Sequence, residues 1–160
     1  MADAREAAPQ KRLDGKVLLV TGAARRIGRS IALRLAEQGA QVAIHYGRSK
    51  AEAEQTAAEC GGRVFQANLG SVAEIQKLFA DVHSAYGRLD GLVNNAAVHR
   101  EMKILDVTED DWDSIHSINL KSVFFCSQAA VRLMMSSGGG KIVNISSLAR
   151  ISHRVARQSA

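Results

Sequence analysis

The fold is decided by residues 16–39, which read KVLLVTGAARRIGRSIALRLAEQG. The aliphatic run at 16–20 is typical of a strand that helices cover on both faces of a parallel sheet. A glycine-bearing turn follows, and the helical stretch after it ends at Gly39, where a left-handed residue often closes a helix. Such a turn directs backbone N–H groups and the positive end of the helix dipole at an anion. The stretch therefore predicts a strand, a phosphate-binding turn and a helix.

The same alternation of strand and helix continues through the chain. Further short apolar runs, read as strands, lie at 41–46, 63–67, 91–95 and 141–146. Helical periodicity is clearest at 72–86, where apolar residues recur on one face. Repeated strand–helix units with right-handed crossovers predict a doubly wound α/β fold. We expect a Rossmann-like parallel sheet of five strands in the order 3-2-1-4-5 and four helices, one strand fewer than the usual dinucleotide-binding sheet.

Three predicted helices begin with the pattern of a capping box, in which a Ser or Thr is followed three residues later by an acid. These patterns start at Ser49, Ser71 and Thr108. We expect a helix to begin after each of them, and Gly87, like Gly39, to close one.

The composition is that of an ordinary soluble globular domain. Of the 160 residues, 46% are hydrophobic and 23% are charged, and no apolar run approaches the length of a membrane span. The first residues lack the apolar core of a secretory signal, and Cys60 and Cys126 form no paired motif, so we expect a cytoplasmic protein. The net charge of +5 is spread along the chain, so no nucleic acid is expected as a partner. The five histidines lack metal-ligand spacing, and no metal is expected.

Two glycines give the turn after the first strand its predicted role. Gly22 permits the tight turn, and Gly28 lets the helix pack closely on the sheet and on a pyrophosphate. The alternative is that both glycines merely turn the chain. Their position between the first strand and the first helix favours a dinucleotide site.

The end of the second predicted strand discriminates between the two nicotinamide dinucleotides. Sites selective for NAD place an acid there, whereas NADP sites place an arginine near the 2′-phosphate. Here Tyr46 stands in the place of the acid, followed by Arg48 and Ser49. Arg25 or Arg26 approaches from the turn. Guanidinium groups pair well with phosphate, so we expect NADP(H) as the cofactor, the alternative being solvated surface charge.

Together these residues resemble the short-chain dehydrogenase/reductase family over about 13–147. The turn matches the family's Thr-Gly-x-x-x-Gly-x-Gly with Arg26 at the middle glycine, and 87–98 contains its Asn-Asn-Ala-Gly motif with Ala97 at the glycine. The pair at 68–69 matches an Asp-Leu pair beside the adenine. The predicted cofactor-binding residues are thus Thr21, Gly22, Arg25, Arg26, Ile27, Gly28, Tyr46, Arg48, Ser49, Asn68, Leu69, Asn95, Ala96 and Ala97.

The resemblance also implies a reaction, in which hydride passes from NADPH to a carbonyl or imine carbon of a small-molecule substrate. Ser147 would polarise the substrate oxygen or nitrogen, and Asn119 would hold a water in a proton relay. The alternative for Asn119 is a polar residue that only interrupts helix hydrogen bonding. Within the family, TGAARRIG followed by HYGRS is most similar to the pteridine reductases, with the 3-oxoacyl-acyl-carrier-protein reductases as the nearest alternative.

The proton donor that the resemblance implies is missing from the predicted site. A tyrosine with a lysine four residues later should follow Ser147 on the next helix, but the only tyrosines are Tyr46 and Tyr86. Tyr46 has Lys50 in the required place, yet it precedes Ser147 and belongs to the adenosine end, away from the reacting atom. We therefore expect this chain alone to be catalytically incompetent.

Three explanations of the missing donor are open. The chain is a C-terminally truncated or frame-shifted reductase, which we favour, or a degenerate noncatalytic NADP-binding or interaction protein, or half of a site that a partner chain completes. We expect a disordered leader at 1–12, an incomplete NADP-binding domain at 13–147 and an atypical tail at 148–160. Without a sixth strand the fifth is an exposed edge, so we expect association or poor solubility. A homo-oligomer is expected only for a full-length protein.

Overall fold

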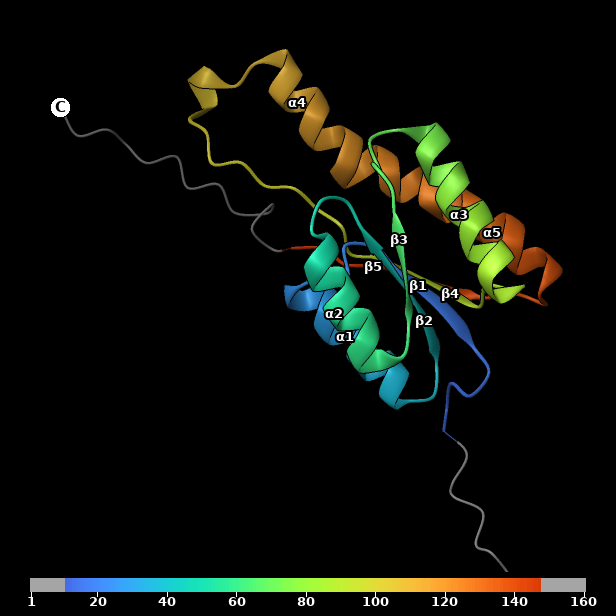
Figure 1. Cartoon of the computed structure of the whole chain (residues 1–160). Coiled ribbons are helices and arrows are strands. Elements are labelled where there is room, and N and C mark those ends of the chain that lie inside the picture. The colour runs from blue at the N-terminus through green and yellow to red at the C-terminus, as the bar shows by residue number, and fades with distance from the viewer. Residues whose placement is uncertain (1–10, 148–160) are drawn as a thin grey trace, which may run out of the picture.

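The computed structural model describes residues 11–147 of the chain (Figure 1). The predicted tail at 148–160 and the first ten residues of the predicted leader lie outside the described residues. Lys11 and Arg12, which we assigned to the leader, belong to a turn in which the backbone N–H of Asp14 donates to the Lys11 carbonyl at 3.2 Å. The described fold therefore already includes two residues that the sequence analysis placed before the domain.

Five parallel strands form one sheet in the order β3-β2-β1-β4-β5, as predicted. The chain winds outward from β1 in one direction and from β4 in the other. The loops that follow these two strands diverge at the carboxyl edge, where open α/β sheets bind ligands. The bounds are β1 Val17–Val20, β2 Gln41–Tyr46, β3 Arg63–Gln66, β4 Gly91–Asn94 and β5 Lys141–Asn144.

Helices cover both faces of the sheet, and Figure 1 shows α1 beside α2 and α3 beside α5. Successive strand residues point to opposite faces, so Leu19 packs under α3 and α5 while Val20 packs under α1 and α2. Burial on both faces explains the near-continuous apolar character of the strands. The bounds are α1 Arg26–Glu37, α2 Lys50–Cys60, α3 Val72–Tyr86 and α5 Ser122–Ser136.

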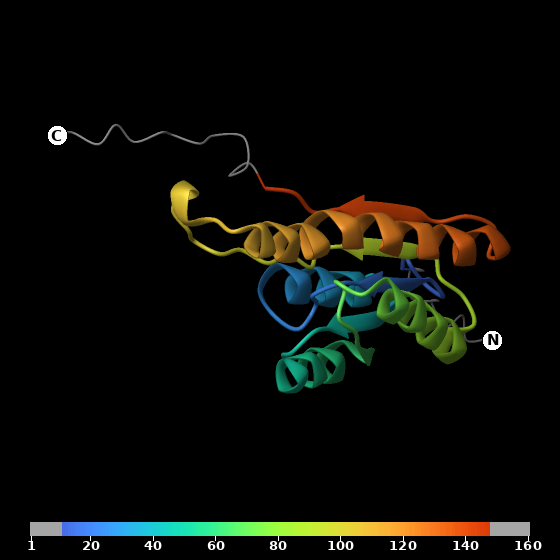
Figure 2. The ribbon, with the colours of Figure 1, turned by 90° about the horizontal axis from the view of Figure 1, so that it is seen from above.

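The fourth predicted helix contains a π-helical interruption. A short 3-10 turn, η1 (Ile104–Asp106), precedes α4 (Glu109–His116), which leads through the π-helical segment η2 (Ser117–Lys121) into α5. Figure 2 shows the orange helical run of α4, η2 and α5 as one continuous rod whose later part lies along the sheet, whereas the yellow η1 stands beyond the ends of the strands. Asn119 lies in η2, and its side chain is bound to the backbone of Val98 on a distant segment. Helical periodicity carries no information about such a contact between distant segments, although single π-turns inside helices are frequent at functional sites.

One of the three predicted capping boxes forms completely. The Thr108 hydroxyl accepts the Asp111 N–H at 3.2 Å, and the Asp111 carboxylate accepts the Thr108 N–H at 3.3 Å. Ser71 accepts the Glu74 N–H at 3.4 Å, but the Glu74 carboxylate bonds to the preceding loop instead of closing the box. Ser49 makes no cap bond, because its ψ of 67° lies outside the extended region that N-cap residues adopt.

β5 forms one edge of the described sheet, as predicted, and several apolar side chains of α4, of α5 and of the segment around β5 are exposed. Val143 and Ile145 keep 49% and 42% of their surface exposed, and Trp112 on α4 and Phe124 on α5 keep 59% and 63%. Open strand edges pair with other chains, so association in solution stays a prediction. Within residues 11–147, no helix combines the length and apolar character that a membrane crossing requires.

Candidate functional site

The turn between β1 and α1 passes so close to its neighbours that it requires its glycines. Gly22 has a φ of +64°, and a Cβ there would lie 3.0 Å from the Ala96 Cα. Gly28 is buried in the first turn of α1, where a Cβ would lie 2.5 Å from the Asn95 amide nitrogen and closer still to the Gly22 carbonyl oxygen. Gly22 therefore permits the tight turn, and Gly28 allows α1 to pack closely against it.

Thr21 and Asn95 hold this turn against the end of β4. The Thr21 hydroxyl oxygen accepts the backbone N–H groups of Asn95 at 2.9 Å and of Ala96 at 3.0 Å. In return, the Asn95 side-chain amide donates to the carbonyls of Thr21 at 2.9 Å and of Gly22 at 3.1 Å. We predicted a cofactor contact for Asn95, but its amide is used to support the turn that would hold the cofactor.

The amino end of α1 is arranged to receive an anion. Arg25 at the N-cap makes no side-chain cap bond, and the first turn of the helix carries no acid. Arg25, Arg26 and Ile27 are exposed around this end. The N–H groups of a first helical turn and the positive end of the helix dipole attract phosphate. The turn and the helix end together fit the pyrophosphate of a dinucleotide.

The two residues that replace glycines of the resembled pattern differ in their backbone. Arg26 has a φ of +52° and is the one non-glycine residue in the described range with a positive φ. A Cβ in this left-handed region costs about 1–2 kcal/mol. Ala97 has no positive φ, so alanine fits there without strain. The middle position of the turn thus keeps a conformation suited to glycine although it holds arginine.

Replacing Arg26 with glycine should stabilise the fold. The left-handed backbone then carries no Cβ, while the greater freedom of glycine in the unfolded chain offsets part of the gain. We expect the free energy of unfolding to rise by about 0.5–1 kcal/mol in urea denaturation followed by circular dichroism. Arg25→Gly is the matched control, because Arg25 has a φ of −156° and should lose stability. Equal losses in both variants would show that Arg26 is not strained.

Basic residues from two segments lie near the amino end of α2. The Arg25 guanidinium is 4.0 Å from the Glu52 carboxylate in the first turn of α2, and Arg48 is exposed just before that helix. Ser49 is half-buried between Arg48 and the helix. Tyr46 is only 5% exposed and packs in the core under α1 and α2, so its ring does not replace the acid of an NAD site as a ligand contact.

Asn68 and Leu69 form a tight loop after β3. The Asn68 side-chain oxygen accepts the Gly70 N–H at 3.0 Å, and the Asn68 N–H donates to the Glu74 carboxylate at 2.7 Å. Leu69 is buried in the core under α3. The loop lies at the carboxyl edge of the sheet, where Asn68 is exposed and Leu69 supports it from beneath.

His45 belongs to this site, and the sequence reasoning did not assign it there. Its side chain is 3% exposed on β2. The Nδ1 atom accepts the Gly22 N–H at 3.1 Å, and the Nε2 atom lies 3.1 Å from the Ala67 carbonyl. Burial lowers the His45 pKa to about 4, although the hydrogen bond to Ala67 acts in the opposite direction. The sequence signal that could have pointed to His45 is the presence of a polar residue within the apolar run at 41–46.

Asn119 is committed to a backbone contact. Its side-chain oxygen accepts the Val98 N–H and its amide nitrogen donates to the Val98 carbonyl, both at 2.8 Å. This pairing anchors the segment after β4 onto the π-helical segment. Both polar atoms of the Asn119 side chain are therefore engaged by Val98, and a role of Asn119 in a proton relay stays a prediction.

Ser147 lies three residues beyond the end of β5 and is exposed. Its strand is tied to β4 by Asn94, which the sequence analysis did not assign to the site. The Asn94 amide donates to the Asn144 side-chain oxygen at 2.9 Å and to the Ser127 hydroxyl of α5 at 3.1 Å. These bonds join the ends of both strands to α5, and so they position the segment that leads to Ser147.

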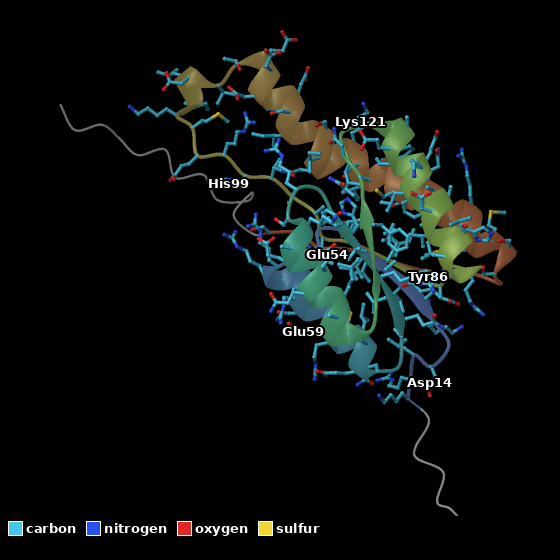
Figure 3. All side chains as sticks on the ribbon, in the orientation of Figure 1. Asp14, Glu54, Glu59, Tyr86, His99 and Lys121 are labelled. Carbon is cyan, nitrogen blue, oxygen red and sulfur yellow. The ribbon has the colours of Figure 1, made fainter. Side chains whose placement is uncertain are left out.

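Tyr86 lies near the amino ends of the strands, away from the carboxyl ends where the candidate site is. Figure 3 shows it at the end of α3, whereas His99, on the segment after β4, lies at the other end of the strands. The Tyr86 hydroxyl donates to the Val42 carbonyl at 3.1 Å, and burial raises its pKa. A general acid must reach the reacting atom with a pKa near the working pH, so Tyr86 cannot serve as one.

The chain is similar in sequence and structure to known dehydrogenases and reductases. The family model described as short chain dehydrogenase matches residues 16–159. A 3-oxoacyl-[acyl-carrier-protein] reductase of Staphylococcus aureus is 42% identical over 138 residues, which cover 83% of this chain and 56% of the relative. A short-chain type dehydrogenase/reductase of Picea abies is 36% identical over 148 residues, covering 84% of this chain and 55% of the relative.

Solved structures of short chain dehydrogenases have a similar fold. A short chain dehydrogenase from Burkholderia cenocepacia in complex with NADP is 38% identical, with a TM-score of 0.81, over 89% of this chain and 60% of that one. The chain thus spans little more than half the length of the relatives that it matches.

Proposed function

The chain belongs to the short-chain dehydrogenase family of oxidoreductases, and we propose that it is the NADP(H)-binding portion of a reductase. The proposed reaction is hydride transfer from NADPH to a carbonyl or imine carbon. The observation that carries the proposal is the turn between β1 and α1. There Gly22 and Gly28 allow a close approach, and Arg25 and Arg26 are exposed at a helix end without a side-chain cap.

The chain's own residues bind and orient the dinucleotide, which supplies the hydride when bound. N–H groups at the amino end of α1 hold the pyrophosphate, and the turn braced by Thr21 and Asn95 keeps them in place. Arg25 and Arg48, which flank the amino end of α2, pair with the 2′-phosphate. The similarity to a dehydrogenase solved in complex with NADP supports this choice of cofactor.

Ser147 and Asn119 act at the substrate end in this proposal. Ser147 donates a hydrogen bond to the substrate oxygen or nitrogen. Asn119 holds the relay water through its main-chain carbonyl, because its side chain is bound to Val98. Its position in η2 supports this role, since π-helical turns are frequent at functional sites.

Two substrate classes suit this hydride transfer. The identity with a 3-oxoacyl-[acyl-carrier-protein] reductase supports 3-oxoacyl thioesters, and the turn sequence TGAARRIG supports pteridines. The second candidate function is that of a noncatalytic NADP-binding or interaction protein. It is favoured by the tyrosines, because Tyr46 is buried in the core and Tyr86 lies at the far edge.

We expect the 160-residue chain to bind NADPH but to oxidise it at least about 100-fold more slowly than a complete 3-oxoacyl reductase does. No tyrosine–lysine pair follows Ser147 in the sequence, and general acid catalysis contributes about 10²–10⁴ to a rate. Fluorescence titration measures binding, and NADPH absorbance measures oxidation with a 3-oxoacyl thioester or a dihydropteridine. Turnover matching that of a complete 3-oxoacyl reductase would refute the expected inactivity, and absence of binding would refute the proposed function.

A further inference from the structure

His45 connects two loops of the cofactor site from inside the sheet. Its Nδ1 atom accepts the Gly22 N–H, and its main-chain carbonyl accepts the Ala23 N–H at 2.9 Å. Its Nε2 atom faces the carbonyl of Ala67, one residue before Asn68. A single strand residue therefore engages two successive N–H groups of the phosphate turn and also the loop after β3.

The ring can do this in one protonation state. A carbonyl oxygen only accepts, so Nε2 must carry the hydrogen that binds Ala67. A backbone N–H only donates, so Nδ1 must keep its lone pair for Gly22. A protonated ring would turn an N–H toward the Gly22 N–H and lose the contact. Burial at 3% exposure favours the neutral ring and lowers the His45 pKa to about 4.

Charged groups on the surrounding elements offer no compensation to a protonated ring. The turn carries the cations Arg25 and Arg26, β3 carries Arg63 and η2 carries Lys121, and none of these charges would stabilise a protonated ring. Glu74 at the start of α3 is a carboxylate, but it already accepts a backbone N–H of the loop after β3. The neutral ring is therefore the state that this part of the fold accommodates.

We propose that His45 is a positioning residue for dinucleotide binding, whose neutral ring holds the Gly22 N–H and so keeps the phosphate turn in its binding conformation. This role rests on the proposed function, because it concerns affinity for NADP(H). His45 takes up the Gly22 N–H, so the pyrophosphate is received by N–H groups further along the turn. Loss of the contact loosens the turn without removing a group that touches the cofactor.

Two substitutions separate the two contacts of the ring. In His45→Asn, a side-chain oxygen takes the place of Nδ1 and keeps the Gly22 contact, whereas in His45→Gln the amide reaches the Nε2 position and keeps only the Ala67 contact. We expect the Asn variant to bind NADP⁺ within about threefold of the wild type. The Gln variant should bind at least about tenfold more weakly, as expected for a backbone N–H left without its acceptor.

Tyr86→Phe is the matched structural control for these titrations. It removes the bond to the Val42 carbonyl, which also lies on β2 but at the other end of the strand from the turn. We expect this variant to lose stability and to keep its affinity for NADP⁺. Isothermal titration calorimetry at pH 7 measures all four proteins, and circular dichroism confirms that each is folded.

Acid stability gives a second readout that needs no cofactor. The His45 pKa is lowered from 6.5 to about 4 in the folded protein, so its contribution to stability is complete above pH 6.5 and is lost as the pH falls toward 4. The unfolding equilibrium constant should rise by at most about 300-fold over this range. Tyr86→Phe should keep this pH dependence, and His45→Asn should lose it.

The outcomes distinguish the role of His45 from the proposed function. Wild-type protein that binds no NADP⁺ refutes the proposed function. If the wild type binds and the folded Gln variant binds equally well, or if Asn and Gln weaken binding alike, the positioning role is overturned. An acid-stability profile that is identical in the wild type and the Asn variant overturns the requirement for a neutral ring.

Discussion

Gly28→Ala should lose both stability and cofactor affinity. The added Cβ would overlap the Gly22 carbonyl oxygen and lie 2.5 Å from the Asn95 amide nitrogen. The Asn95 amide cannot withdraw freely, because it is bound to the carbonyls of Thr21 and Gly22. Overpacking costs about 1–3 kcal/mol, and the higher helix propensity of alanine returns at most about 1 kcal/mol. Since the overlap is deep, we expect the free energy of unfolding to fall by about 2 kcal/mol.

The displaced turn should also bind NADPH at least about tenfold more weakly, which corresponds to about 1.4 kcal/mol. Urea denaturation and fluorescence titration measure the two effects. Gly47→Ala is the matched control, because a Cβ at Gly47 has no neighbour within 4 Å. Its stability should stay within about 0.5 kcal/mol of the wild type. If Gly28→Ala behaves like Gly47→Ala, the close approach of α1 to the turn is not required.

Arg48→Glu should lower the affinity for NADPH by about 100-fold and change the affinity for NADH little. A charge-assisted hydrogen bond to phosphate contributes about 1.5–3 kcal/mol, and reversing the charge adds repulsion from the 2′-phosphate. NADH lacks that phosphate, so it measures every other effect of the substitution. Parallel titrations of both dinucleotides give the ratio.

Lys50→Glu is the charge-matched control for Arg48→Glu. Lys50 lies two residues further on and pairs with Glu54 at 3.7 Å on the surface of α2. Its reversal changes the local charge equally, and we expect the NADPH affinity to fall by less than about fivefold, since exposed charges are screened by solvent and salt. Equal losses in both variants would mean that the amino end of α2 attracts NADPH by its net charge and not through a specific contact of Arg48.

The strands and the glycines of the turn could be predicted because their signals are local, and the strand order followed from the usual order of a dinucleotide-binding sheet. Residues 16–39 contain a complete strand, turn and helix, and Gly22 and Gly28 stand where the backbone needs them. The π-helical segment at Asn119 could not be predicted, because it accompanies a contact with Val98 that lies 21 residues away. The cap expected at Ser49 failed because residue types alone do not set the backbone angles of the loop before the helix.

The parts of the site that were missed are polar residues inside apolar strands. His45 and Asn94 each lie on a buried strand. The partners of the His45 ring come from the turn after β1 and the loop after β3, and those of the Asn94 side chain from β5 and α5. A pattern of hydrophobic periodicity treats both as interruptions. Tyr46 shows the converse, because a motif position that suggested a ligand contact holds a ring buried in the core.

A direct comparison of NADPH and NADH binding to the wild-type chain tests the central claim. In the proposed function, the phosphate turn would give affinity for either dinucleotide, and the arginines near the amino ends of α1 and α2 would give a preference for NADPH. Titration at low and at physiological salt should show NADPH bound at least about tenfold more tightly than NADH, with the difference shrinking as salt rises. Equal affinity, or a preference for NADH, would contradict the claim that Arg25 and Arg48 recognise a 2′-phosphate.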